Sequence, residues 1–491
     1  MQLDNLYSII TLPLLFALSA FFTAATQLLA PKARTPIVVF PHHPSHVAVK
    51  KGTSSADSDK LSLKALVLSR CRSLFSEYKT AWWLANGHLQ TAYSVMADFT
   101  MTDKMYYNRQ YIRLLDGGTL GLDFAPVDSF RLKPDTPIIV VQHGLTGGSY
   151  EAYVRAVLYP ACTPVEEGGL GYRAVVINFR GCASHIPSSS SQFHAHRGGL
   201  GAGVPITSSM LYSAGHTDDL RQALFYISHT YPEAPLLGLG FSLGANIMTR
   251  YISEEGPHCR LTSGCALACP WDLAQNNERL LSTFIGKHVY AKALGTNLLN
   301  LVKRHQNALV AKPSGRILEA MAAVLALKNP TLRDFDHHFS RIASGPPPSF
   351  PYVSAEAYYD GQSSHHAVKD VHVPFLSINS ADDPIVQSVP MDGGGNGFVV
   401  MALTPGGGHL GWFQSGASWR EVDRWTTQPV LEWLRMAGEM VVGDTCKCRS
   451  LQVDTDGWIK EQGIDHLGCK PAEGGGIIDG NAVDDGNMQG L

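Results

Sequence analysis

Charged residues are scarce in this chain of 491 residues, and neither sign dominates. Asp, Glu, Lys and Arg together make up 16% of it, the formal net charge is −3, and no block of basic residues occurs. A surface that binds phosphate backbones needs concentrated positive charge. The composition therefore argues against a nucleic-acid partner, and a hydrophobic content of 45% is instead typical of a large, well-packed core.

Cysteine provides no sign of a metal site. The nine cysteines are odd in number and scattered, and Cys446 and Cys448 form the one Cys-x-Cys pair without further ligands nearby in the sequence. We expect reduced structural thiols, no metal and no cofactor. Asn-x-Ser/Thr sequons with x other than Pro are also absent, which fits a cytosolic catalytic part.

Basic residues are missing from the start of the chain. The stretch Leu6–Ala30 carries no charge, Asp4 is the only early charged residue, and Lys32 and Arg34 follow the stretch. Such a segment can span a hydrocarbon core of about 30 Å, and positive charge after it favours a cytosolic C-terminal side. We expect residues 1–34 to be a membrane anchor, at the endoplasmic reticulum or lipid-droplet surface. A cleaved signal peptide or a buried helix is the alternative, although a signal peptide would have a basic start.

Short apolar runs bounded by Gly, Pro or Asn recur along the chain, and helical patterns separate several of them. The runs are PIIVVQHG, AVVINFRG, PLLGLGFS, CALACP, PFLSINS and FVVMALTPGGGH. Continuous apolar strands that alternate with helices are typical of a parallel sheet covered on both faces. The sequence thus predicts an α/β fold with a mostly parallel sheet, helices on both faces and one helical insertion.

These patterns divide the chain into six segments. They are a membrane anchor (1–34), an N-terminal extension with a hairpin at Asp116-Gly117-Gly118 (35–134), the first half of the α/β core (135–270), a helical cap insertion (271–372), the second half of the core (373–440), and a tail rich in Gly and Asp (441–491). We expect the tail to be partly disordered.

A candidate nucleophile lies in Gly240-Phe241-Ser242-Leu243-Gly244. An apolar strand ends there and a helical pattern begins, which is the context that a Gly-x-Ser-x-Gly elbow requires. Glycine on both sides of Ser242 removes the Cβ atoms that would clash in so sharp a turn. The bland alternative is a structural turn serine.

A serine hydroxyl needs a histidine base that a carboxylate orients. Among 20 histidines, His409 lies in a glycine-rich loop directly after the last strong strand, and most of the others lie in polar loops. For the acid, strand PFLSINS leads into Asp382 and Asp383, and we favour Asp383 over Asp382. The order Ser, Asp, His is that of α/β-hydrolases.

Acyl transfer also needs donors for a tetrahedral oxyanion. We expect one from the backbone N–H of Leu243, after the nucleophile. The second is the N–H of Leu145, in the glycine-rich loop after strand PIIVVQHG. His143 in the same loop is expected to be structural, and Arg180 is expected to form a buried ion pair with Asp218 or Asp219.

The chain resembles a particular alpha/beta-hydrolase family. That family includes bacterial YheT-type hydrolases, plant embryogenesis-associated hydrolases, mammalian membrane-anchored lipid hydrolases and yeast medium-chain fatty acid ethyl ester synthase/esterases. The matching segments occur in order over roughly residues 80–435, and they are NGHLQT (86–91), HGLTGGS (143–149), NFRGC (178–182), YSAGHTDDL (212–220), the serine elbow, and GGHLGWF (407–413).

The resemblance implies a Ser–Asp–His hydrolase acting on acyl esters, often lipids. We therefore expect a serine esterase or lipase for medium- or long-chain acyl esters, working through an acyl-enzyme. Its substrate would be a small-molecule acyl ester or acyl-CoA. The alternative on the same triad is an acyl-CoA:alcohol O-acyltransferase that makes esters such as medium-chain fatty acid ethyl esters. A binding protein without activity is disfavoured, because all three triad residue types are present.

Overall fold

The computed structural model describes residues 35–51, 54–130, 132–183, 203–311, 315–416, 421–443 and 448–481. The predicted membrane anchor, residues 1–34, lies outside them, as does Cys446. Within the described ranges, none of the helices combines the length and the apolar character needed to cross a bilayer. The cysteines in these ranges are all free thiols.

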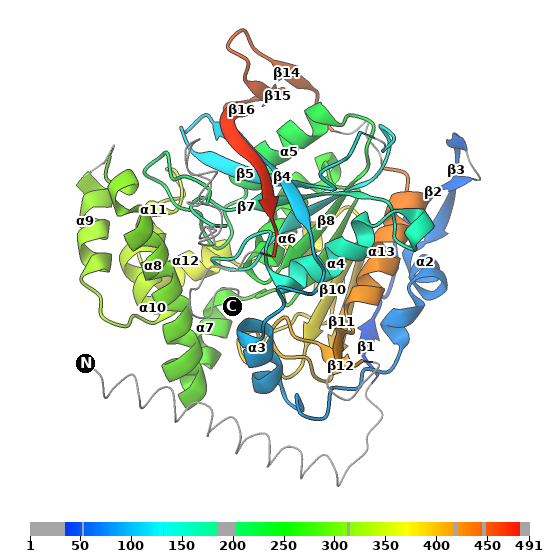
Figure 1. Ribbon diagram of the computed structural model, residues 1–491, viewed down its shortest axis with the longest axis horizontal. Coiled ribbons are helices and arrows are strands. Elements are labelled where there is room, and N and C mark those ends of the chain that lie inside the picture. Colours follow the sequence, from blue (N-terminus) through cyan, green and yellow to red (C-terminus); the bar gives the residue numbers. More distant parts are fainter. Residues whose placement is uncertain are drawn as a thin grey trace.

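A twelve-stranded sheet forms the centre of the molecule (Figure 1). Its strand order is β1-β11-β10-β9-β8-β6-β7-β5-β4-β16-β15-β14. The middle strands are parallel, and they are β7 (Arg173–Asn178), β6 (Ile138–Gln142), β8 (Leu236–Phe241), β9 (Ser263–Leu267), β10 (Phe375–Ser380) and β11 (Val399–Thr404). Nearly all their residues are buried. The predicted α/β fold is confirmed, with antiparallel strands added at both edges.

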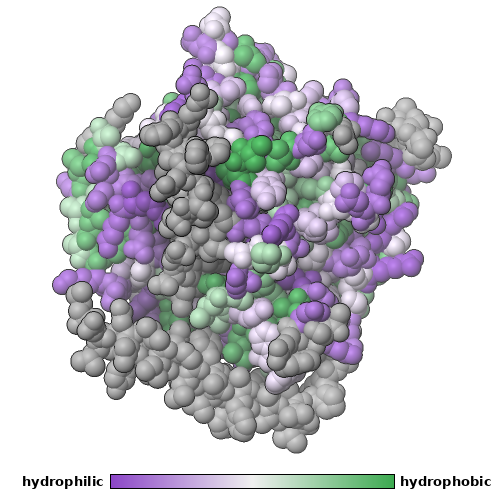
Figure 2. Space-filling view, viewed as in Figure 1, coloured by the Kyte–Doolittle hydropathy of each residue, from purple (hydrophilic) through white to green (hydrophobic). Residues whose placement is uncertain are grey.

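Helices cover both faces because side chains alternate along each strand. In β6, Ile138 and Val140 join one core while Ile139 and Val141 join the other. The first core lies under α5 (Asp218–Thr230) and α6 (Leu243–Glu255), and the second under α2 (Leu63–Arg70), α4 (Ala152–Cys162) and α13 (Thr427–Met440). On the face shown in Figure 2, hydrophilic and hydrophobic residues are interspersed.

Residues 271–372 form a helical insertion between β9 and β10. Its helices are α7 (Leu273–Ser282), the π-helix η4 (Gly286–Tyr290), α8 (Ala291–Leu309), α9 (Gly315–Leu325), α10 (Leu332–Phe335), the π-helix η5 (Asp336–Ser340), α11 (Arg341–Ala343), α12 (Ala355–Gln362) and the 3-10 helix η6 (Val368–Asp370). The described part of this interval contains no strand, as the sequence predicts. In Figure 1 most of these helices lie together at the left of the sheet, and several contribute to the first core.

The N-terminal extension packs along the sheet. Besides α2, its elements include β1 (Ile37–Val39), which is antiparallel to β11, the hairpin of β2 (His46–Lys51) and β3 (Ser54–Ser62), and the helix α3 (Gly87–Met96). The predicted second hairpin is present as β4 (Tyr106–Leu114) and β5 (Thr119–Ala125). Gly117 in its turn has a φ of +82°, which glycine adopts without strain.

Part of the tail from 441, which is predicted to be partly disordered, is regular in the structure. Residues 448–481 contain β14 (Leu451–Val453), β15 (Ile459–Glu461) and β16 (Ile464–Asp479), and β16 pairs antiparallel with β4. The composition is polar, but Ile459, Leu467, Cys469 and Ile478 are buried. These side chains and the backbone groups along the open edge of β4 provide the partners that order the segment.

Candidate active site

Ser242 occupies a sharp turn between β8 and α6. Its backbone has φ +50° and ψ −121°, a strained conformation of the kind found in nucleophile elbows. A Cβ on Gly244 would lie 2.4 Å from the Gln142 carbonyl oxygen, and one on Gly240 would lie 2.5 Å from Ala245 Cα. Both glycines are therefore required sterically.

His409 lies between Ser242 and Asp383. Its Nε2 is 2.8 Å from Ser242 Oγ, and its Nδ1 is 2.8 Å from Asp383 Oδ2. All three residues are buried, and each follows the carboxyl end of a parallel strand, β8, β10 or β11. In this geometry Nδ1–H donates to the carboxylate, so Nε2 accepts the serine proton.

The two neighbouring aspartates have different partners. Asp383 Oδ1 accepts from the backbone N–H groups of Ile385 and Val386 at 2.8 and 2.9 Å, while its Oδ2 faces His409. Asp382 Oδ1 instead accepts from the backbone N–H of Gly408 at 2.9 Å. Burial raises the pKa of the Asp382 carboxyl. Asp382 thus braces the histidine loop, and Asp383 contacts the imidazole.

The segment Asn86–Thr91 also holds the histidine loop. Sequence reasoning assigned this segment no chemistry. Thr91 Oγ1 accepts from the backbone N–H of His409 at 2.8 Å, and Gln90 accepts from the N–H of Phe413 and donates to its carbonyl oxygen. The only sequence signal for this role was that the segment belongs to the ordered set of motifs.

The loop after β6 forms a turn beside Ser242. The N–H of Gly147 donates to the carbonyl of Gly144 at 3.2 Å, and Thr146 has a φ of +55°, as in a type II turn. Leu145 in this turn and Leu243 both line a cavity beside Ser242. Leu243 is the first residue of α6, where N–H groups have no acceptor within the helix.

Two tyrosine hydroxyls hold this turn on either side of Leu145. Tyr153 Oη accepts from the N–H of Gly144 at 3.0 Å, and Tyr212 Oη accepts from the N–H of Thr146 at 3.2 Å. Burial raises the pKa of both tyrosines well above the usual value, so both stay protonated. The sequence did not indicate either contact.

His143 in the same loop is neutral and structural, as expected. Burial lowers the pKa of its imidazole to about 4. Its Nδ1–H donates to the carbonyl of Gly144 at 2.7 Å, and its Nε2 accepts from the N–H of Phe179 at 3.2 Å. These contacts fix the start of the turn.

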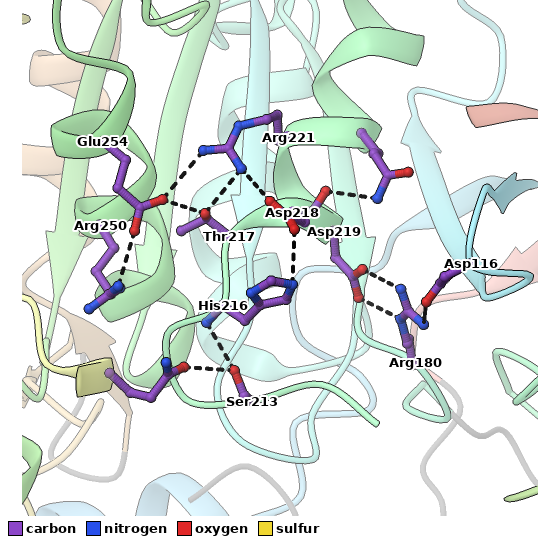
Figure 3. Close-up of polar contacts among 12 residues, drawn as sticks. Asp116, Arg180, Ser213, His216, Thr217, Asp218, Asp219, Arg221, Arg250 and Glu254 are labelled. Atoms are coloured by element: carbon purple, nitrogen blue, oxygen red, sulfur yellow. Dashed lines mark hydrogen bonds and ion pairs between the residues drawn. The ribbon is translucent and has the colours of Figure 1, made fainter. Parts of the chain in front are cut away.

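The YSAGHTDDL segment (212–220) contributes two aspartates to ion pairs with arginine side chains. Figure 3 shows Arg180 between Asp116 and Asp219, with nitrogen–oxygen distances of 2.5 and 2.6 Å. Arg180 is almost fully buried. Its predicted ion pair is therefore confirmed, with Asp219 as the partner, while Asp218 pairs with Arg221 at 2.5 Å.

A cavity opens at Ser242. Its wall is mostly apolar and comes largely from the helical insertion, with Leu211, Leu273, Leu280, Leu294, Leu298 and Leu332 among its residues. A cavity with an apolar wall of this kind suits an apolar ligand. The described residues contain no group of three or more His, Cys, Asp or Glu suited to a metal ion.

Residues 137–391 match the family model described as the alpha/beta hydrolase fold. The chain belongs to this family. A monoacylglycerol lipase of Saccharomyces cerevisiae is 31% identical over 72% of this chain and 79% of its own length. The Embryogenesis-associated protein EMB8 of Picea glauca is 28% identical over 75% and 74%. The yeast medium-chain fatty acid ethyl ester synthase/esterase 2 is 26% identical over 75% and 87%. The resemblance seen in the sequence is thereby confirmed.

Proposed function

We propose that this alpha/beta hydrolase is a serine carboxylic-ester hydrolase acting on medium- or long-chain acyl lipid esters. The observation that carries the proposal is the position of Ser242 Oγ, 2.8 Å from His409 Nε2, beside an apolar cavity. A relative that is named a monoacylglycerol lipase supports the same substrate class.

In the proposed mechanism Ser242 Oγ attacks the ester carbonyl carbon while its proton passes to His409 Nε2. The N–H groups of Leu145 and Leu243 stabilise the resulting oxyanion. Collapse of the intermediate breaks the ester bond, and His409 returns the proton to the departing alcohol. Water then releases the acyl group by the same steps, while Asp383 keeps the imidazole oriented.

A fluorophosphonate probe tests the assignment of the nucleophile. It should label the wild-type protein and the Ser282→Ala control, whose exposed serine lies on α7, and it should fail to label Ser242→Ala. Labelling of Ser242→Ala as strong as that of the wild type would overturn the assignment.

The second candidate is an acyl-CoA:alcohol O-acyltransferase on the same triad. The relative named an ester synthase favours it, because an alcohol in place of water would resolve the same acyl-enzyme into an ester. Incubation with an acyl-CoA, with and without ethanol, separates the two candidates. Ethyl ester formation that exceeds release of the free acid would favour the synthase.

We also propose roles for the remaining segments. Residues 271–372 act as a cap over the acyl site, between core halves at 135–270 and 373–440. Residues 1–34 anchor the protein, with the catalytic part in the cytosol and the endoplasmic reticulum or lipid droplet as candidate membranes. The anchored protein should resist carbonate extraction, and protease added to sealed microsomes should digest the catalytic part. If the catalytic part is protected from the protease until detergent is added, it lies on the lumenal side instead.

A further inference from the structure

One face of α7 carries two amides into the apolar cavity wall. Leu273, Asn276, Asn277 and Leu280 all line the cavity, and their spacing of three and four residues places them on one side of the helix. The face therefore reads Leu-Asn-Asn-Leu, with its polar pair between two apolar residues. The proposed acyl site accounts for the leucines but not for the asparagines.

The orientation of the Asn276 amide is fixed by its surroundings. Its Oδ1 accepts from the backbone N–H groups of Gln387 and Ser388, each at 3.2 Å. A flip of the amide would lose both bonds. Its Nδ2 is buried and meets no acceptor among the described residues, and the side chain is only 7% exposed. The Nδ2 amide of Asn276 is therefore a fixed donor that has no acceptor among the described residues.

Asn277 supplies the complementary group. Its Oδ1 is buried and meets no donor in the described parts of the chain. An unsatisfied buried polar group costs about 1–3 kcal/mol, so a ligand that pairs with both amides would recover that free energy. A cavity wall that offers both a donor and an acceptor suits a hydroxyl group, which can accept from one amide and donate to the other.

The position of the two asparagines and the charges in the cavity wall restrict the chemical class of the ligand further. Asn276 bonds to the loop that follows Asp383, four and five residues further along the chain, and both asparagines line the same cavity as Ser242. Of the described residues that line the cavity, none is Lys or Arg, and Asp336 is a carboxyl. A phosphate-bearing alcohol would find no cation there.

We propose that Asn276 and Asn277 select esters whose alcohol carries a free, uncharged hydroxyl, such as glycerol monoesters, over simple alkyl and phosphodiester-bearing esters. The proposal rests on the ester hydrolase function proposed above. A site built to hydrogen-bond a hydroxyl discriminates against an analogue without one, because the amides are then left unpaired.

The test compares three esters of one acyl chain, with glycerol, ethanol or glycerophosphocholine as the alcohol. In Asn277→Leu, the ratio of kcat/KM for the glyceryl ester to that for the ethyl ester should fall about 10-fold, as loss of a buried hydrogen bond predicts. Asn300→Leu, the same change at an exposed position on α8, should leave the ratio as in the wild type. The wild type should also prefer the glyceryl to the glycerophosphocholine ester.

A second variant tests the donor. Asn276→Asp keeps an oxygen for the N–H groups of Gln387 and Ser388 but replaces the Nδ2 donor, so the same ratio should fall. Fluorophosphonate labelling of Ser242 in each variant reports an intact site.

Two outcomes separate the proposals. A wild type that hydrolyses none of the esters would overturn the hydrolase function itself. Hydrolysis with an unchanged ratio in Asn277→Leu and Asn276→Asp would overturn only the role of the amides. The variants can also be assayed with the ethyl ester of a hydroxy fatty acid. If its kcat/KM falls by the same factor as that of the glyceryl ester, the amides contact a hydroxyl on the acyl chain, which would overturn the assignment to the alcohol.

Discussion

The triad and the helical wall of the same cavity are built in opposite ways. Ser242, His409 and Asp383 have their hydrogen bonds satisfied within the protein, whereas Asn276 and Asn277 each keep a buried polar atom without a partner in the described structure. Satisfied networks are rigid and pre-organised, while an unsatisfied group gains free energy only when a ligand arrives. On the roles proposed above, the sheet edge supplies the chemistry and the insertion supplies the choice of substrate.

Removing the proposed nucleophile at the sheet edge should abolish nearly all ester hydrolysis. Ser242→Ala should lower kcat for a lipid ester by roughly a millionfold, as loss of the triad serine does in other hydrolases. Ester hydrolysis measured by titration of released acid gives the result. Substantial residual turnover in Ser242→Ala would mean that another group attacks the ester.

The next largest effect should separate the two aspartates. Asp383→Asn should lower kcat about ten-thousandfold, because the imidazole loses the acceptor that fixes its tautomer. Asp382→Asn keeps an oxygen for the N–H of Gly408 and should cost far less. Steady-state kinetics of both variants decide the matter, and the reverse ranking would transfer the role to Asp382.

A moderate effect on kcat is expected at Tyr212, which lines the cavity and bonds to the turn beside Ser242. Tyr212→Phe removes the acceptor for the N–H of Thr146, which loosens the turn that presents Leu145. We expect kcat to fall about tenfold with little change in KM, because an oxyanion donor acts mainly in the transition state. A rise in KM alone would indicate a role in substrate binding instead.

These expectations show what local sequence could and could not provide. Ser242 and His409 follow from short motifs beside recognisable strands, and the sheet follows from apolar runs, because each signal is contiguous. Tyr212, Thr91 and the placement of Asp382 depend on contacts between segments far apart in the chain, which periodicity does not reveal. The strands of residues 448–481 could not be predicted for the same reason, since β16 pairs with the edge of β4.

The smallest effect is expected on stability, at Glu151. This residue is an exception to the satisfied hydrogen bonding near the sheet edge. Glu151 follows the turn beside Ser242, its Oε1 has no partner among the described residues, and burial raises the pKa of its carboxyl to about 8. The protonated form is therefore favoured in the fold, so its contribution to stability is present below about pH 4.5 and is lost as the pH rises toward 8.

Glu151→Gln should remove that dependence. We expect the variant to melt roughly 2–5 °C above the wild type at pH 8 and close to it at pH 5, as measured by differential scanning fluorimetry. A stabilisation equal at both pH values would show that the charge of Glu151 is not the cause.

The most direct test of the central claim is to trap the acyl-enzyme. The wild-type protein is mixed with a long-chain glyceryl monoester, quenched in acid during turnover, digested and analysed by mass spectrometry. The account predicts that the acyl mass is found on Ser242, and that Asp383→Asn slows its appearance. Turnover with the acyl group on another residue, or with no acylated peptide under conditions that stabilise acyl-serine esters, would contradict the account.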